Sequence, residues 1–237
     1  MEPSANPPPF KNRVLASLPA DELKRIRPHL SQVTLKLNRT LHDPGQIVDT
    51  VYFLEEGICS TVVTMADGST IEVGITGTDG FVGLPAVLGT RHSLNRSFMQ
   101  IAGHGFSIKA RALQEHFDGS SELRLSMQRV VQGMLMQTAQ TAACNRVHEL
   151  EERLARWLMM CEDRVQNDSI PITHEFLAMM LGTRRTTVTV AAGMLHKAGL
   201  IEYSRGHVAI KNREGLVHAA CECYQVIHEE YVRLGLL

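Results

Sequence analysis

The sequence predicts an α+β chain with a β-rich N-terminal half, a long helix, and a C-terminal unit of short helices and strands. Three observations lead to this fold class. Short β-rich runs separated by turn residues extend from Val33 to about Ala110, helical periodicity follows to Arg164, and two short helices with a hairpin begin at Pro171. Many short strands at close spacing are typical of a barrel or jelly roll, so we expect an N-terminal β-roll.

Composition sets the outer limits. A chain of 237 residues that is 44% hydrophobic can form one large or two ordinary domains, and its net charge of -1 argues against a nonspecific polycation. No apolar run reaches the length of a membrane span, and the N-terminus lacks the features of a secretion signal. We therefore expect a cytoplasmic protein with no membrane partner. Five cysteines without scaffold-like spacing indicate reduced thiols.

Helical and strand signals alternate along the N-terminal half. After the proline-rich start, residues 10–30 predict two short helical pieces, with Pro19-Ala20-Asp21 opening the second. The turn Ala66-Asp67-Gly68-Ser69 between the runs CSTVVTM and TIEVGIT is a strong hairpin signal. We expect a hairpin at this point of the β-roll.

The helical pattern from about Ser120 to Arg164 is longer than an ordinary globular helix. One side of it carries a seam at three- and four-residue spacing, apolar at first and then increasingly polar. Such a stripe indicates either an intramolecular core or a dimer interface. The seam consists of Met127, Val130, Met134, Gln137, Thr141, Cys144 and His148.

The stretch from Pro171 to Val190 predicts a helix, a glycine turn and a second helix. Thr173 is placed to cap the first helix, and Gly182 stands where the chain must bend. In the second helix Val188 and Leu195 fall on one face, which leaves Arg and Thr residues on the other sides. The following run LIEYSRGHVAI predicts two short strands, so the whole unit indicates a winged helix-turn-helix.

The outer side of the second helix suits double-stranded DNA. Guanidinium groups bind guanine edges or phosphates, and threonines hydrogen-bond to either or contact a thymine methyl. Between Ile172 and Arg213 six Lys or Arg residues stand against two acidic ones, a net charge of +4. The candidate DNA-contacting residues are Thr183, Arg184, Arg185, Thr186, Thr187, Thr189 and Val190, with Arg205 and His207 on the wing.

DNA readers of this kind commonly dimerise to meet two half-sites about one helical turn apart, which favours the dimer interpretation of the seam. We predict a parallel homodimer through Met127, Val130, Met134, Gln137 and Thr141. The expected organisation is a helical segment (1–30), a β-roll sensor domain (31–118), a dimerisation helix (119–164), and a winged helix-turn-helix domain with an extra C-terminal helix (165–237).

A further amphipathic helix is expected beyond the wing. We expect it to pack on the winged domain, or in a functional interpretation to brace that domain, with Cys221 or Cys223 making the brace redox-sensitive. Cys221 and Cys223 lie two residues apart, and side chains two apart on a helix point to different sides. No metal site is therefore predicted. The residues that define this helix are Val217, Ala220, Tyr224, Ile227, Tyr231 and Leu234.

The order of β-roll, long helix and winged helix-turn-helix resembles the Crp/Fnr family of bacterial transcription regulators over nearly the whole chain. The resemblance rests on VYFLEEG from Val51, Asp67-Gly68, GFVG from Gly80, Arg96-Ser97, and LGTRRTTV from Leu181. It implies a DNA-binding transcription regulator that works with RNA polymerase and is not an enzyme. It also implies a β-roll of the cyclic-nucleotide-binding type.

Members of the family that bind cyclic nucleotides carry Gly-Glu followed by Arg-Ser. Here Gly83 matches the glycine, but Leu84 replaces the glutamate and offers no acceptor for a ribose hydroxyl. The sequence therefore argues against cyclic AMP and predicts no cofactor, while the effector stays unknown. Arg96 of the Arg96-Ser97 pair is either an anion ligand or a surface arginine, and Thr138 falls near the position that contacts the base in relatives.

Other sensor chemistries find little support. Iron-sulfur members carry N-terminal cysteines, whereas this chain has none before Cys59. An axial haem ligand would come from His42, His92 or His104, although a single histidine is more often structural. Two alternatives to a ligand-free regulator remain: a module gated by a nucleotide or another small molecule, and a cupin-type metal enzyme, for which the β region has no HxH pair.

The resemblance also assigns roles on the second helix. Arg185 matches the family's first base-reading arginine, which implies a bidentate guanine contact. The next family glutamate is Thr186 here, and a later arginine is Val190, so the operator is expected to differ from the family's best-known half-site. The candidates for phosphate contact are Thr183, Arg184, Thr187, Arg205 and His207.

Overall fold

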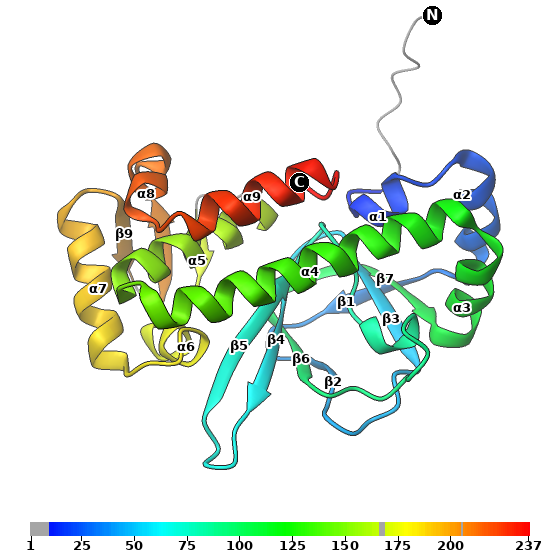
Figure 1. Ribbon diagram of the computed structural model, residues 1–237, viewed down its shortest axis with the longest axis horizontal. Helices are drawn as coiled ribbons and strands as arrows, with labels where there is room; N and C mark the ends of the chain where they lie inside the picture. Colours follow the sequence, from blue (N-terminus) through cyan, green and yellow to red (C-terminus); the bar gives the residue numbers. More distant parts are fainter. Residues whose placement is uncertain (1–9, 166–168, 205) are drawn as a thin grey trace, which may run out of the picture.

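The chain folds into a β-roll, a long helix that crosses it, and a smaller unit of helices and strands at one end (Figure 1). The computed structural model describes residues 10–165, 169–204 and 206–237. This arrangement confirms the predicted α+β fold class with its C-terminal winged helix-turn-helix. Within those ranges no helix is both long and apolar enough to cross a bilayer.

Short helices at the N-terminal end pack against the β-roll. They are formed by the two predicted pieces, the second of which begins directly after Pro19. Asn12 ties this segment down, since its Nδ2 donates to the carbonyls of Leu54 at 3.1 Å and Gly80 at 2.8 Å. These bonds offset the cost of burying the amide. The helices are α1 (Arg13–Ala16), α2 (Ala20–Ile26) and the 3-10 helix η1 (Arg27–His29).

The β-roll consists of two antiparallel sheets, with strand orders β1-β7-β3 and β2-β6-β4-β5. The predicted hairpin joins β4 to β5, where Met65 N donates to Ser69 O at 2.8 Å and Gly68 has a φ of +84°. The elements are β1 (Ser31–Leu35), β2 (Thr40–His42), β3 (Thr50–Leu54), β4 (Ile58–Thr64), β5 (Thr70–Thr76), the 3-10 helix η2 (Leu84–Ala86), β6 (Arg96–Ile101), β7 (Gly103–Lys109) and α3 (Ala110–Gly119).

The predicted single long helix is in fact two helices, α4 (Ser121–Val147) and α5 (Leu150–Val165). His148 between them has an extended backbone, with φ -107° and ψ 148°. Glu149 N donates to the Glu152 carboxylate at 3.1 Å, which is half of a capping box at the start of α5. In the sequence, the E-x-x-E spacing of Glu149 and Glu152 is the local signal that indicates this helix start. The break allows α5 to leave the direction of α4 and pack on the C-terminal helices.

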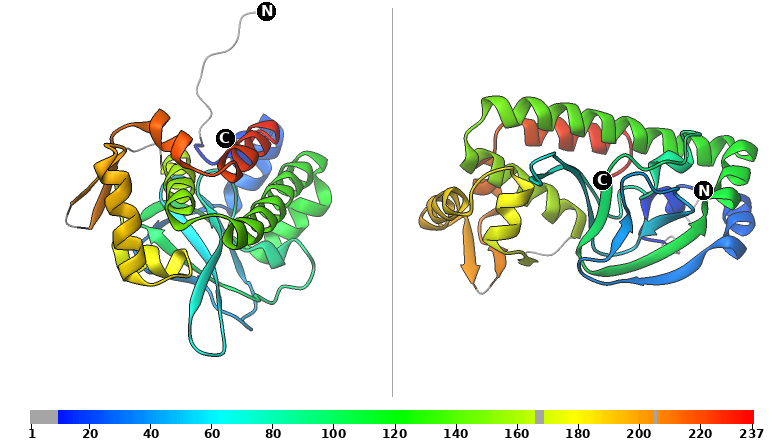
Figure 2. Two further views of the ribbon diagram at one scale, coloured as in Figure 1. Left: turned by 60° about the vertical axis from the view of Figure 1, so that its left-hand side comes forward. Right: turned by 90° about the horizontal axis from the view of Figure 1, so that it is seen from below.

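The C-terminal unit places three short strands in the order β8-β10-β9 beside its helices. The predicted C-terminal amphipathic helix is also divided, because Ala220 is extended, with φ -76° and ψ 151°. Its second part lies along α4 (Figure 2). Tyr231 in this part and Leu236 just after it lie against Gly133 of α4. The elements are β8 (Ser169–Pro171), α6 (His174–Met180), α7 (Arg185–Lys197), β9 (Ile201–Ser204), β10 (His207–Ile210), α8 (Arg213–Ala219) and α9 (Cys223–Arg233).

One apolar core extends through both halves of the molecule. Phe53 and Phe81 of the β-roll, Trp157 of α5, and Val188 and Leu195 of α7 belong to the same cluster of buried residues. Burial of this kind is the main favourable term in folding. The β-roll and the winged unit are therefore packed on each other through α4 and α5.

A buried ion pair crosses the same boundary. Arg164 Nη2 on α5 lies 2.7 Å from Asp79 Oδ2, with the two side chains 1% and 3% exposed. Arg164 also donates to Gln137 Oε1 on α4 at 3.0 Å, and Tyr231 on α9 donates to the same oxygen at 3.1 Å. Asp79 Oδ1 accepts a bond from Gly77 N at 2.6 Å. One network thus joins the β-roll, α4, α5 and α9.

Asp79→Asn is expected to lower the free energy of unfolding by about 3–5 kcal/mol, because it leaves the buried Arg164 charge without a counter-charge. Urea unfolding measures the loss. Asp49→Asn is the matched control: the Asp49–Arg91 pair is 70% and 49% exposed, so its removal should cost at most about 1 kcal/mol. Similar losses in the two variants would contradict the structural role of the buried pair.

Candidate functional site

Helices α6 and α7 form the predicted helix-turn-helix. Thr173 is the N-cap of α6, and its hydroxyl accepts a bond from Phe176 N at 3.2 Å. The chain bends at Gly182, whose φ of +60° suits a residue without a Cβ. The inner face of α7 consists of the buried residues Val188, Ala191, Ala192 and Leu195. The opposite face of α7 therefore points away from the core.

The outer face of α7 carries most of the predicted DNA-contacting residues. Thr183 is half-buried, and exposed Thr189 is engaged within the unit, since its hydroxyl donates to Arg185 O at 3.0 Å and lies 3.1 Å from His174 Nδ1. Helix α7, described along its whole length, has no acidic residue in its first turn, so its N-terminus keeps its positive potential. The exposed residues here are Arg184, Arg185, Thr186, Thr187 and Val190.

Strands β9 and β10 form the wing beside α7. The predicted wing residue His207 is exposed and pairs with Pro171 of β8, whereas Arg205 lies outside the described residues. Strand β8 was not predicted from the sequence. The sequence pattern that indicates this strand is the alternation of Ile170 and Ile172 around Pro171, and both isoleucines are buried in the structure.

A cavity of about 590 Å³ lies between the β-roll and α4. Arg96 does not line it, because Arg96 and Ser97 are adjacent on β6 and point to opposite faces of the strand. The Arg96 guanidinium instead donates to Thr40 Oγ1 at 3.0 Å and lies over the Phe98 ring, 5.3 Å from its centroid. The structure therefore favours the surface interpretation of this arginine. The predicted effector residues that line the cavity are Gly83, Leu84, Ser97 and Thr138.

The lining of this cavity is neutral. Among the described residues no Asp, Glu, Lys or Arg contributes to it. Of the histidines considered as haem ligands, His42 and His92 line the cavity, while His104 pairs with Glu56 elsewhere. Burial lowers the pKa of His42, and no described residue hydrogen-bonds to its Nε2. The cavity therefore offers hydroxyl, amide and imidazole groups to a ligand, but no Asp, Glu, Lys or Arg partner among the described residues.

Most residues of the predicted seam on α4 are buried in the core of their own chain. Met127, Val130 and Gln137 are at most 2% exposed within their own chain, so they cannot form the predicted dimer interface. Met134 and Thr141 are half-buried. The pattern showed correctly that the stripe is covered, but the covering elements are the β-roll, α5 and α9. The side of α4 that stays exposed carries Leu125, Gln128, Gln132, Leu135, Ala139 and Ala142, again at three- and four-residue spacing.

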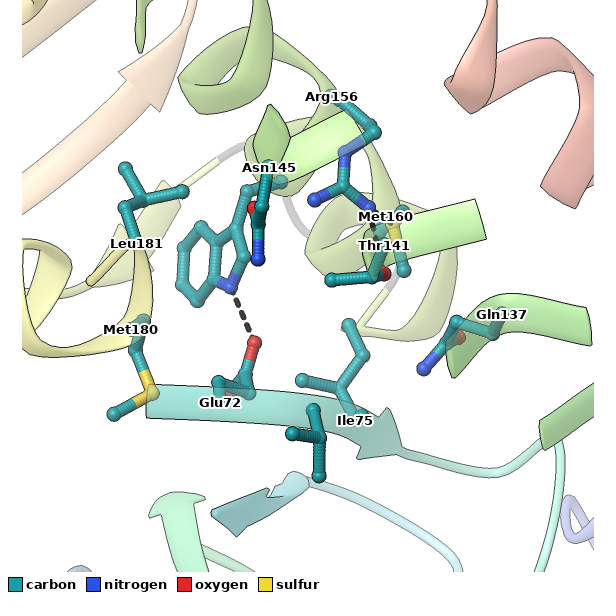
Figure 3. A pocket seen from close by; sticks show the side chains of 12 residues that line it. Glu72, Ile75, Gln137, Thr141, Asn145, Arg156, Met160, Met180 and Leu181 are labelled. Carbon is teal, nitrogen blue, oxygen red and sulfur yellow. Dashed lines mark hydrogen bonds between the residues drawn. The ribbon is translucent and has the colours of Figure 1, made fainter. Parts of the chain in front are cut away.

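A second, much smaller space of about 10 Å³ marks the junction between β5, α4, α5 and the helix-turn-helix (Figure 3). Glu72 on β5 accepts a bond from Trp157 Nε1 at 2.7 Å. Met180 and Leu181 at the end of α6 line the same space, and Arg153 Nη2 donates to Leu181 O at 2.6 Å. The turn of the helix-turn-helix is thus held by both the β-roll and α5.

The two C-terminal cysteines lie together, contrary to the sequence-based expectation. Helix α8 ends at Ala219, so Cys221 is not helical, and its Sγ lies 3.5 Å from Cys144 Sγ on α4. Cys223 Sγ lies 3.6 Å from His148 Nδ1. The expectation that these thiols diverge was wrong because it assumed one continuous helix. The hydrogen bond with Cys221 lowers the pKa of Cys144, and all of these cysteines are buried.

Comparison with known proteins agrees with this geometry. Residues 152–219 match the model of the Crp-like helix-turn-helix domain. The global nitrogen regulator of Nostoc sp. is 22% identical over 188 residues, which cover 75% of this chain and 83% of that protein.

Solved structures share the fold. FixK2 from Bradyrhizobium japonicum superposes with a TM-score of 0.70 and 14% identity, covering 81% of this chain and 98% of the other. A putative transcriptional regulator of the Crp/Fnr family from Eubacterium rectale gives a TM-score of 0.67 and 17% identity, covering 85% and 94%.

Glu72 should make stability depend on pH, because burial raises its pKa from 4.5 to about 7. Between these values the folded chain holds a proton that the unfolded chain releases, so wild-type stability falls as pH rises. Glu72→Gln lacks this loss. The unfolding free energy of Glu72→Gln relative to that of the wild type should therefore increase from pH 4.5 to 7 and stay constant above pH 7.

Urea unfolding across this pH range measures the difference. Glu115→Gln, at a 69% exposed side chain, is the control and should follow the wild type. A difference between Glu72→Gln and the wild type that stays constant with pH would rule out the linkage.

Proposed function

We propose that the chain is a DNA-binding transcription regulator of the Crp/Fnr family and that it acts as a homodimer whose α7 helices read two DNA half-sites. The outward face of α7 carries this proposal. It combines basic, hydroxyl and apolar groups on a helix whose opposite side is anchored in the core. Family resemblance adds RNA polymerase as the expected partner in transcription.

The side chains on this face suggest a division of labour. Arg185 begins α7 and is exposed, so it can reach a guanine edge with both guanidinium nitrogens. Arg184 is the N-cap residue, at the end of the helix that attracts phosphate. Val190 is 62% exposed in the middle of the face, which suits contact with a thymine methyl.

The dimer is assigned to the exposed side of α4 rather than to the buried seam. Leu125 and Leu135 are 51% and 64% exposed on this side. Leu88 and Leu94, which are 56% and 85% exposed, line the same cavity as Leu135. Apolar side chains at heptad spacing are typical of a helix that pairs in parallel with its copy. Such pairing brings the two α7 helices to one side of the dimer.

The cavity is proposed as the effector site, with an uncharged ligand in place of cyclic AMP. Its neutral lining lacks a partner for a phosphate, and Leu84 occupies the position of the family glutamate. Arg96 is engaged with Thr40 and Phe98 outside the cavity. Polar side chains such as Asn95, Ser97 and Thr138 line the cavity and can hydrogen-bond to a hydroxyl or carbonyl group.

Arg185→Ala is expected to weaken binding to the selected operator by about 1–3 kcal/mol and relax preference at one base pair, because a base contact is lost. Arg184→Ala should weaken binding to all duplexes alike, because a phosphate contact is lost. Fluorescence anisotropy with operator and random duplexes at one salt concentration measures both effects. Arg111→Ala, at a 90% exposed arginine on α3, is the control. Equal losses on both duplexes for Arg184→Ala and Arg185→Ala would refute the assignment.

Leu135→Glu is expected to convert a wild-type dimer to a monomer at micromolar concentration, because two carboxylates would face each other across paired α4 helices. Light scattering after size-exclusion chromatography gives the mass. Leu37→Glu, at a leucine 56% exposed in the β-roll, should leave the dimer intact. A wild-type monomer, or a dimer unaffected by Leu135→Glu, would overturn the proposed interface.

A further inference from the structure

We propose that Cys144, His148, Cys221 and Cys223 bind a single zinc-like divalent metal ion that clamps the start of α9 to the end of α4. The four side chains come from two segments far apart in the sequence. Three thiols and an imidazole are a common donor set for structural zinc. The site goes beyond the proposed function and shares no residue with the outer face of α7 or with the effector cavity.

The spacing of the ligand atoms fits one ion. One atom from each residue, sulfur or ring nitrogen, lies within 4.8 Å of all the others. Cys144 Sγ and Cys221 Sγ are 3.5 Å apart, and Cys223 Sγ is 3.6 Å from His148 Nδ1. A tetrahedral zinc ion with bonds of about 2.0–2.3 Å holds its ligand atoms roughly 3.5–3.8 Å apart. A four-iron cluster places several atoms between its cysteines and requires them farther apart.

The local structure brings these groups together for identifiable reasons. Cys144 and His148 are four residues apart at the end of α4, so they share one side of the helix. Cys221 and Cys223 come from the short turn between α8 and α9, where the chain is not helical until Cys223. The three cysteines form a separate cluster of buried residues that faces His148.

Neighbouring groups orient the ligands. His148 Nε2 lies 3.0 Å from the Glu222 carboxylate, which leaves Nδ1 directed at the thiols. A carboxylate on the outer nitrogen is the usual support of a metal-binding histidine. Gln140 Nε2 donates to Cys223 Sγ at 3.1 Å and helps to hold the sulfur in place. Such supporting bonds are expected around the ligands of a metal site, whereas a disulfide between Cys144 and Cys221 does not require them.

A metal ion bound at this site would rigidify the junction between α4 and α5. His148 is the C-cap of α4, where the chain leaves the long helix and enters α5. A metal bound there would fix the direction of α5, which packs on α7 and α8. It would also hold the first turn of α9, whose Tyr231 bonds to Gln137 on α4.

The experiment uses the full-length protein, reduced and purified without chelators. We expect about one zinc ion per chain by elemental mass spectrometry. We also expect cobalt(II) added to the metal-free protein to give thiolate charge-transfer bands and the intense visible bands of tetrahedral coordination. Cys144→Ser and Cys223→Ser should lose both signals. Cys59→Ala, at a buried cysteine of the β-roll, is the matched control and should keep them.

Glu222→Gln provides a second test, because Glu222 is exposed and its replacement leaves all four ligands in place. It should weaken cobalt binding about 10–100-fold while circular dichroism shows a folded chain.

Absence of stoichiometric zinc and of a cobalt spectrum in folded, reduced wild type would overturn the site. So would iron with labile sulfide, a Cys144–Cys221 disulfide in the peptide map of that preparation, or unchanged cobalt binding in both serine variants. Metal binding is measured without DNA, so failure here and failure of the proposed function are distinguishable.

Discussion

The buried ion pair between Asp79 and Arg164 is the constraint on which the rest of the structure depends. A charge at this depth is tolerated only with a counter-charge and hydrogen-bond partners. Arg164 can meet that condition only if α5 lies against the β-roll, α4 presents Gln137, and α9 brings Tyr231 to the same oxygen. The pair therefore links the position of the winged unit to the β-roll.

The same region joins the cavity to the DNA-reading helices. Gln137 and Gly74 line both the large cavity and the small space at the junction. On the same strand, Ile71 lies beside Gly182, the turn between α6 and α7. A ligand in the proposed effector cavity would contact Gly74, which lies on the same strand as Ile71. A ligand that contacts two arrangements of this region differently shifts their populations. Such a shift would carry the effect of a bound ligand from the β-roll to the helix-turn-helix.

Local signals predicted the elements well, and contacts between distant segments were harder to predict. The Thr173 cap, the Gly182 bend and the 66–69 hairpin follow from a few neighbouring residues, and all three are present. The break between α4 and α5 also had a local signal, but the helical periodicity on both sides concealed it. The direction of Arg96 depends on which face of β6 meets the cavity, and a two-residue motif does not contain that information.

The sequence by itself determined the fold class, the helix-turn-helix and the chemistry of its outer face, because periodicity, capping and turn residues act within a few positions. Tertiary structure decided which elements cover each stripe. It buried Met127 and Val130 against their own chain, and it bent the chain at Ala220 so that Cys221 and Cys223 meet Cys144 and His148. A stripe on a helix shows that a face is covered, but the covering partner depends on packing among residues far apart in sequence.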